Sequence, residues 1–330
     1  MNDKSVNYGT LLREGFAYLL ENYPDVFLLG QGLWSPWYVG SSMTDLDKEF
    51  GKDRVIDSPV SEAAVTGLGV GASLLGTRPV IIHPRIDFML YAVDPIVNQA
   101  AKWSSMFSGQ ASPNVTIRGI INRGGEQGAQ HSQALHSWFA HVPGLKVAMP
   151  YDPIDARDML IASVLDDSPT IFIDDRWLYE IEPENYTIPE PKPLNSFSPK
   201  KLIKGNDITI VASSYSVVTA KEVCNSLELD GIKAELFDIR LISPLDLETV
   251  KESVAKTKRI AVIDGGWSFC GLSGEIIAEI ATTLDTNSFL SKPMRFTIKD
   301  SPAPTSSILE KIYYPNAEDI IEEIKKTILV

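Results

Sequence analysis

The sequence predicts an α/β protein made of two doubly wound domains, each a mainly parallel sheet with helices on both faces. Short apolar segments typical of buried strands alternate with longer amphipathic segments typical of helices. A segment with five prolines, at residues 181–204, divides this pattern in two. A chain of 330 residues is long enough for two domains of ordinary size. We therefore expect an N-terminal domain at 1–180, a linker at 181–204 and a second domain at 205–330.

The expected elements follow from hydrophobic periodicity and from turn residues. A stripe of leucine and phenylalanine predicts a first amphipathic helix, which Pro24 ends. In the first domain we expect helices at 8–22, 88–106 and 152–165, and strands at 26–30, 79–83, 114–121, 145–149 and 170–173. In the second domain we expect strands at 208–212, 233–238, 260–263 and 294–298, and helices at 216–229, 246–255, 271–283 and 316–328.

The composition is that of a soluble globular protein, with 44% hydrophobic and 22% charged residues. A net charge of −13 argues against a nucleic-acid partner or an anionic membrane, because phosphates would be repelled. The two cysteines, Cys224 and Cys270, suit a reducing compartment and provide no disulfide framework. No secretory signal and no apolar run of membrane-spanning length are visible. We expect a cytoplasmic protein.

The segment that begins at Asp57 reads as the start of a helix. Ser58 suits the N-cap, Pro59 suits the first helical position, and Glu62 falls in the first turn. An uncharged segment with three glycines follows, and glycine is unfavourable in a helix by about 0.8–1 kcal/mol relative to alanine. We expect a neighbouring backbone or a ligand against this buried helix. On local sequence alone, Glu62 is best explained as a complement to the helix dipole.

Two further stretches hold candidate site residues. Trp34, Trp37 and Tyr38 follow the first strand, where so many large rings predict a pocket wall, a subunit interface or core packing. The polar, glycine-rich loop at 122–133 contains His131, the first of three histidines within eleven residues. Without nearby cysteines or carboxylates these form only a weak zinc signal, and we predict no metal site. A histidine in such a loop more often contacts substrate.

Taken together, several motifs resemble one family. Residues 58–63, 128–133 and 142–147, followed by 237–246 and 264–267, are similar in order and spacing to the β subunit of the E1 component of 2-oxo acid dehydrogenases. That family is transketolase-like and depends on thiamine diphosphate. The resemblance runs from about residue 6 to the end of the chain. It implies an N-terminal pyrimidine-binding domain and a C-terminal transketolase-like domain.

The resemblance also assigns roles to individual residues. In this family the residue matching Glu62 hydrogen-bonds N1′ of the cofactor's aminopyrimidine and promotes the imino tautomer that removes the C2 proton. Phe88 falls where an aromatic ring stacks on the aminopyrimidine; its alternative is a core aromatic at a helix start. His131 falls where a histidine contacts substrate. Gln31, a cofactor contact by position, replaces an acid proposed to belong to a proton path.

One part of the family's site is missing from the chain. The Gly-Asp-Gly motif that holds diphosphate and Mg²⁺ does not occur in this sequence. In E1 enzymes of this type the motif belongs to a separate α subunit, which implies an α2β2 assembly with the cofactor between subunits. Main-chain carbonyls near residues 163–168 match a place where relatives bind K⁺.

Departures from the family's pattern bear on the substrate. His83 and Arg85 precede Phe88 where the family has other residues, and both could bind a carboxylate or phosphate of an unusual substrate. Pairing with Asp87, or a subunit contact, explains them equally well. Trp34 also replaces a smaller or more polar residue and is a third candidate substrate contact.

The first functional hypothesis is an E1 β subunit that decarboxylates a 2-oxo acid and, with a lipoyl E2 partner, transfers the acyl unit to lipoamide. The second is a subunit of a split transketolase-like carboligase or ketol-transferase that works without lipoamide. The third is a scaffold that only binds its α partner, which the presence of Glu62, Phe88 and His131 disfavours.

Overall fold

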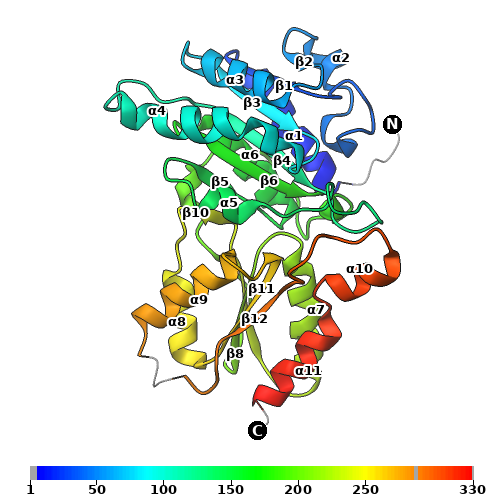
Figure 1. The fold of residues 1–330 in the computed structure, drawn as a ribbon, viewed down its shortest axis with the longest axis vertical. Helices are drawn as coiled ribbons and strands as arrows, with labels where there is room; N and C mark the ends of the chain where they lie inside the picture. The colour runs from blue at the N-terminus through cyan, green and yellow to red at the C-terminus, as the bar shows by residue number, and fades with distance from the viewer. Residues whose placement is uncertain (1–5, 286–288, 329–330) are drawn as a thin grey trace.

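The computed structural model describes residues 6–285 and 289–328, which form two α/β domains placed end to end (Figure 1). The larger sheet has the strand order β10-β5-β6-β4-β3-β1-β2 and the smaller has the order β12-β11-β8-β9-β7. Helices cover both faces of each sheet (Figure 1). This arrangement confirms the predicted fold class.

The N-terminal domain contains most of the elements that the sequence predicts. Its strands are β1 (Val26–Gly30), β2 (Val55–Asp57), β3 (Arg78–His83), β4 (Thr116–Ile121), β5 (Lys146–Ala148) and β6 (Thr170–Asp175). Its helices are α1 (Tyr8–Asn22), η1 (Gly40–Met43), α2 (Leu46–Phe50), α3 (Glu62–Ser73), η2 (Phe88–Ala92), η3 (Asp94–Ala100), α4 (Ala101–Met106), α5 (His136–Ala140), α6 (Pro153–Leu165) and η4 (Arg176–Leu178).

The C-terminal half follows the same alternation of strands and helices. Its strands are β7 (Lys200–Ile203), β8 (Ile208–Ala212), β9 (Ala234–Asp238), β10 (Leu241–Ser243), β11 (Ile260–Trp267) and β12 (Met294–Ile298). Its helices are η5 (Leu194–Ser196), α7 (Ser216–Leu229), α8 (Glu248–Thr257), α9 (Leu272–Thr283), α10 (Ser307–Tyr313) and α11 (Ala317–Ile328).

Two strands cross the boundaries expected from sequence. Residues 200–203, assigned to the linker, form β7 and pair antiparallel with β9. β10, which follows the second domain's β9, pairs antiparallel with β5 of the first sheet. The remaining strand pairs in both sheets are parallel. Lone edge strands of three or four residues leave too little periodicity to be recognised in a sequence.

Two helices differ from the sequence-based prediction. α3 begins at Glu62 with Ser61 at its N-cap, rather than at Pro59 with Ser58 as cap, and the cap side chain forms no hydrogen bond. The helix expected at 88–106 is a succession of 3₁₀ turn, π-helix and α-helix in η2, η3 and α4. A π segment commonly marks a functional site because the extra residue re-aims the side chains around it.

The first helix shows how local sequence and packing agree. Asn7 and Thr10 form a reciprocal capping box, in which each side chain accepts a hydrogen bond from the other's backbone N–H. The predicted apolar stripe, including Leu12 and Phe16, is fully buried against α6 and the sheet. α1 and α6 thus cover one face of the sheet, while α3, η3 and α5 cover the other.

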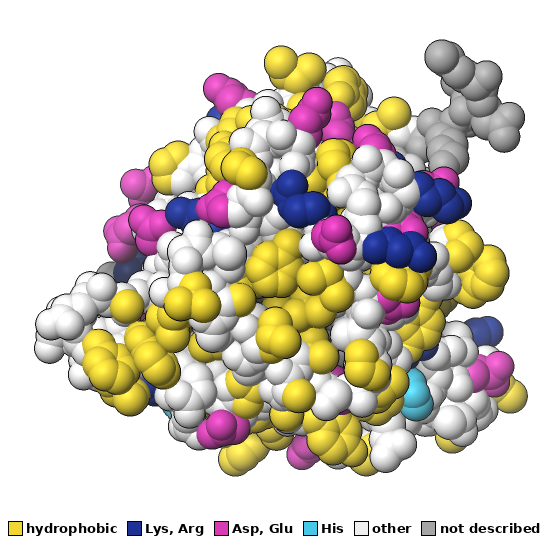
Figure 2. All heavy atoms as spheres, turned by 90° about the horizontal axis from the view of Figure 1, so that it is seen from above, with side chains coloured by type: hydrophobic (Ala, Val, Ile, Leu, Met, Phe, Trp, Pro, Cys, Tyr) yellow, Lys and Arg dark blue, Asp and Glu magenta, His cyan; other side chains and the backbone are white. Residues whose placement is uncertain are grey.

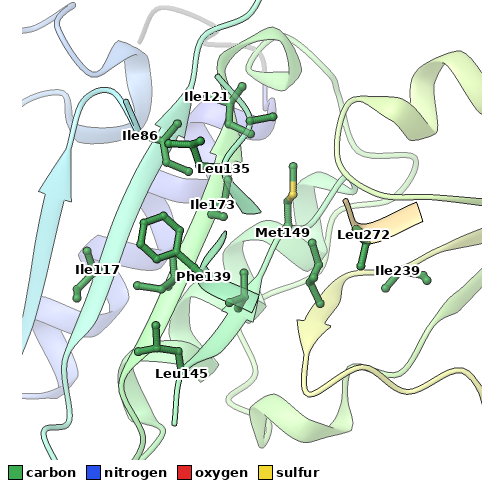
Figure 3. Packing of buried hydrophobic residues seen from close by; sticks show 14 of the residues in the cluster. Ile86, Ile117, Ile121, Leu135, Phe139, Leu145, Met149, Ile173, Ile239 and Leu272 are labelled. Atoms are coloured by element: carbon green, nitrogen blue, oxygen red, sulfur yellow. The ribbon is translucent and has the colours of Figure 1, made fainter. Parts of the chain in front are cut away.

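The hydrophobic core is continuous across the domain boundary. Ile86, Phe139 and Ile173 of the first domain belong to the same buried cluster as Ile239 and Leu272 of the second (Figure 3). Burial of apolar surface stabilises by about 25 cal/mol per Å². The two domains are therefore joined by packing as well as by chain connectivity.

The first sheet also contains a fully buried ion pair. Arg118 of β4 donates two hydrogen bonds of 2.8 Å to the carboxylate of Asp174 in β6. The hydroxyl of Tyr179 donates to the same carboxylate at 2.6 Å. Buried charges of this kind persist where they are paired and hydrogen-bonded, because an unpaired charge in the core is strongly unfavourable.

Candidate active site at the carboxyl edge of the first sheet

The candidate site residues gather where the parallel strands of the first sheet end. Gln31 follows β1, Arg85 lies two residues past β3, and Arg176 directly follows β6. Glu62 opens the helix that follows β2. In open α/β sheets the carboxyl ends of the strands are the usual place for a ligand, because the loops there can vary without disturbing the sheet.

Glu62 lies at this edge as the first residue of α3 and is half-buried. Its carboxylate forms no hydrogen bond or ion pair with any residue that the structure describes. Gln31, Ser58 and His83 line a hollow of about 10 Å³ beside it. The N-terminus of a helix stabilises a negative charge, so the position suits a carboxylate that remains available to a ligand.

Phe88 and His131 come together from separate elements. Their rings meet edge to face with centroids 5.3 Å apart, and both residues are half-buried. Asp87 accepts hydrogen bonds from the backbone N–H and the side chain of Gln133, which ties the start of η2 to the glycine-rich loop. The resemblance places both rings beside the cofactor, and the fold brings them next to each other.

His83 differs from the expected anion contact. The ring is almost fully buried, and Nε2 lies 3.1 Å from the hydroxyl oxygen of Thr66 in α3. Burial lowers the pKa of His83 to about 4, so the ring is neutral near pH 7. A neutral imidazole provides no charge for a carboxylate or phosphate. His83 therefore lines the hollow as an uncharged ring, which can offer a substrate a hydrogen bond but no charge, and its role as a substrate contact stays a prediction.

Trp34 is held by two interactions near the start of β2 and does not line the hollow beside Glu62. Its indole N–H donates to the carbonyl of Val55 at 2.8 Å, and the ammonium of Lys52 lies 3.9 Å from the centre of its ring. Both partners lie at the beginning of β2, whereas the site lies beyond the strand's carboxyl end. These two interactions hold the ring at the start of β2, and the expected substrate contact by Trp34 stays a prediction.

Arg85 has a partner that sequence reasoning missed. Arg176 donates hydrogen bonds to the carbonyls of Trp37 and Tyr38. Burial and the nearby charge of Arg176 lower the pKa of Arg85. Arg85 donates to Gln127 at 3.2 Å, and neither guanidinium forms an ion pair with a carboxylate among the residues described. Arg176 follows a strand that gave no functional signal, so only the fold reveals it.

Gln31 connects these arginines to the hollow. Its side-chain amide donates to the hydroxyl of Tyr38 at 3.0 Å. Tyr38 in turn supplies the carbonyl that accepts from Arg176. The hollow beside Glu62 and the two guanidinium groups thus belong to one contiguous surface.

One face of α3 is uncovered, which corrects the expectation of a fully buried helix. Added Cβ atoms on Gly67 or Gly71 would meet nothing within 4 Å, whereas one on Gly69 would collide with Ile81. Leu68 is 59% exposed on the same helix. Hydrophobic side chains gather across the end of the molecule that carries α2 and α3 (Figure 2). An apolar helix face of this kind indicates a protein interface.

Two other candidate sites have structural explanations. His136 is fully buried and contacts Asp264, and the described residues contain no cluster of metal-ligating side chains. At the expected K⁺ position, Arg78 donates to the carbonyls of Val164 and Asp166 at 3.1 and 3.2 Å. The guanidinium satisfies these oxygens, so the arrangement does not fit a potassium site.

The chain matches two family models that together span most of its length. Residues 4–181 match the pyrimidine-binding domain of transketolase, and residues 200–320 match the transketolase C-terminal domain. The pyruvate dehydrogenase E1 component subunit beta of Rickettsia felis is 36% identical over 303 residues, covering 91% of both chains. The chain belongs to the E1 beta subunit family. Family membership confirms the resemblance and the transketolase-like domains that it implies.

Other members and structures agree. The mitochondrial pyruvate dehydrogenase E1 component subunit beta-1 of Oryza sativa is 36% identical over 315 residues, covering 92% of this chain and 81% of the relative. A solved split-gene transketolase, described as an inactive beta4 tetramer, superposes with a TM-score of 0.79 at 19% identity, over 99% of each chain. None of the helices described here has the length and apolar character to cross a membrane.

Proposed function

We propose that this chain is the β subunit of a thiamine-diphosphate enzyme that decarboxylates a 2-oxo acid and, with a lipoyl E2 partner, passes on the acyl unit. The observation that carries the proposal is the carboxylate of Glu62, which lies at a helix N-terminus beside a hollow without a hydrogen-bond partner among the described residues. A carboxylate so placed can share a proton with a heterocyclic nitrogen of a ligand.

The neighbouring side chains fit the same cofactor. Glu62 would hold the proton at N1′ of the bound aminopyrimidine, and Phe88 would pack against that ring. His131, whose ring touches that of Phe88, contacts the substrate. Gln31 lines the hollow as an uncharged hydrogen-bonding group. When bound, thiamine diphosphate supplies the electron sink for breaking the bond between the carboxyl and carbonyl carbons.

The proposal requires a second subunit. A hollow of about 10 Å³ accepts little more than a water-sized group, so by itself it can enclose only a small part of the cofactor. No Gly-Asp-Gly motif is available to hold diphosphate and Mg²⁺. The uncovered face of α3, which begins at Glu62, offers an apolar surface beside the hollow. We assign this surface to the α subunit of an α2β2 assembly.

A second reaction class is favoured by one observation. Arg85 and Arg176 place two positive charges at the site without a carboxylate partner among the described residues, a costly arrangement unless an anion joins them. A substrate that carries a phosphate or second carboxylate would supply it. This supports the alternative of a transketolase-like carboligase that acts without lipoamide on an anionic substrate.

Calorimetry tests the main proposal. The chain is titrated with thiamine diphosphate and Mg²⁺, first alone and then in complex with its co-expressed α subunit. We expect tight binding in the complex and binding at least about tenfold weaker by the chain alone. Equal affinity in both would contradict a shared site. No binding in either would favour the scaffold hypothesis.

The complex also separates the two reaction classes. Activity with a 2-oxo acid that depends on added lipoyl E2 supports the E1 reaction. Product formation from a 2-oxo acid or ketose plus an aldehyde, independent of lipoyl E2, supports the carboligase.

A further inference from the structure

A second cavity lies between the domains, apart from the site at Glu62. It has a volume of about 380 Å³, within the range of small-molecule pockets. Arg123 and Trp177 of the first domain line one side, and Tyr215 and Tyr314 of the second line the other. α11 packs on α7 beside this boundary (Figure 1).

The topology of the second sheet singles out this position. β8 connects through α7 to β9 on one side, and the chain then crosses through α8 to β11 on the other side of β8. The carboxyl ends of β8 and β11 therefore form a topological switch point, where the flanking loops diverge and leave a crevice. Ser216, just after β8, and Ile263 of β11 both line the cavity.

The inner end of the cavity has a buried positive charge. The side chain of Arg123 is 9% exposed, and its Nε donates to Asp175 at 2.6 Å. Its two terminal nitrogens form no hydrogen bond with any described residue. Gly265 lets the guanidinium approach closely, since an added Cβ would lie 2.6 Å from Nη2. The terminal nitrogens are therefore free to donate to a ligand, and a carboxylate is the strongest partner for a guanidinium.

The outer end carries the opposite charge. Glu222 of α7 and Glu318 of α11 line the cavity and are exposed. Within the described part of the chain, neither carboxylate has an ion-pair partner. The two therefore favour a cationic group at the mouth.

Aromatic rings line the walls between these ends. Trp177 and Tyr215 meet edge to face with centroids 6.4 Å apart, and the Arg123 guanidinium carbon lies 5.4 Å from the Tyr215 ring. The hydroxyl of Tyr314 accepts the N–H of Gly124 across the domain boundary. These rings offer apolar contact area whose conformation is already fixed.

We propose that this cavity binds a free α-amino acid with an apolar or aromatic side chain. The ligand's carboxylate pairs with the terminal nitrogens of Arg123, its ammonium faces Glu222 and Glu318, and its side chain packs on the aromatic walls. Because the walls come from both domains, an occupied cavity joins them and stabilises their relative placement. This inference is independent of the thiamine-diphosphate site.

Calorimetry and thermal unfolding of the full chain test the proposal with L-phenylalanine, L-leucine and L-tryptophan. We expect at least one to bind below about 1 mM, the upper end of ordinary small-ligand affinities, and to raise the unfolding temperature. Phenylpropionate, which lacks the ammonium, and phenethylamine, which lacks the carboxylate, should bind at least about tenfold more weakly than L-phenylalanine. The proposal is overturned if none of the three amino acids binds, or if the two analogues bind as tightly as L-phenylalanine.

A pair of variants on α7 tests the placement. Glu222→Gln removes one carboxylate at the mouth and should weaken amino-acid binding by about three- to tenfold. Glu228→Gln, an exposed change on the same helix outside the cavity, should leave the affinity unchanged. Equal effects of the two variants would show that binding occurs elsewhere and would overturn the assignment.

Discussion

Nε2 of His136 in the first domain lies 3.0 Å from Oδ1 of Asp264 in the second. Both side chains are fully or almost fully buried, and Asp264 also accepts the backbone N–H groups of Gly266 and Ser273. Burial by itself raises the pKa of Asp264, but the His136 ring and the two N–H donors outweigh it, so this pKa lies below its ordinary value. The contact joins the start of α5 to β11 across the domain boundary.

Replacing this carboxylate should destabilise the protein. Asp264→Asn retains one acceptor oxygen but loses the charge, and we expect a loss of about 2–4 kcal/mol at pH 7. Because the folded pKa is depressed, the wild-type contribution is complete above the unfolded pKa of about 4 and is lost as the pH falls through the folded value. Urea unfolding at several pH values measures both effects. Asp300→Asn, on an exposed position, is the control, and equal losses in the two variants would contradict the assigned role.

His83 should make stability depend on pH in a different window. Its pKa is about 4 in the folded state and 6.5 in an exposed, unfolded chain, so between these limits the unfolded chain binds more protons and stability rises with pH. The difference corresponds to roughly 3 kcal/mol. His83→Gln keeps a hydrogen-bonding group near Thr66 and should remove this rise. If the variant keeps the wild-type slope between pH 4 and 6.5, the ring is not the group responsible.

The role proposed for Glu62 requires its acidic proton. Glu62→Gln keeps the size of the side chain and should lower kcat at least about 100-fold, in line with the usual share of general acid–base catalysis. Association with the α subunit, measured by size-exclusion chromatography, should be unchanged. Retained activity would refute the catalytic assignment, whereas loss of association would indicate that Glu62 acts in assembly.

Arg85 and Arg176 predict that the substrate carries a phosphate or a second carboxylate. Arg85→Gln and Arg176→Gln should each raise KM about tenfold or more for a substrate with a phosphate or second carboxylate, because a charge-assisted contact is lost. KM should change little for a 2-oxo acid that has no charged side chain, such as pyruvate. Lys204→Gln, an exposed charge change outside the site, serves as control. Equal changes for both substrate types would argue against an anion contact.

The glycines of α3 provide a matched pair. Gly67 faces open space, so Gly67→Ala should stabilise the isolated chain by up to about 1 kcal/mol through helix propensity. Gly69 packs on Ile81, so Gly69→Ala should destabilise it through overpacking. If the α subunit covers this face, Gly67→Ala should also weaken the complex. Denaturant unfolding measures the first two effects, and a pull-down titration with the α subunit measures the third.

Much of the fold could be predicted because its information is local. The limits of β8, β12 and α7 agree with the hydrophobic pattern, since a buried parallel strand and an amphipathic helix impose their periods on the sequence. Glu62, Phe88 and His131 could be named from motifs that lie within short segments. The sequence by itself thus determined the fold class and the family, and it named the residues that we propose for the cofactor site.

The tertiary structure decided features that depend on distant residues. Burial makes the ring of His83 neutral. Two interactions at the start of β2 hold the Trp34 ring, and Arg78 donates hydrogen bonds to carbonyls that were expected to bind K⁺. Arg176, which directly follows β6 and lies 91 positions after Arg85 in the chain, comes near Arg85 because β4 alone separates β3 from β6 in the sheet. Charge state and charge clustering arise from desolvation and long-range packing, which leave no local pattern in the sequence.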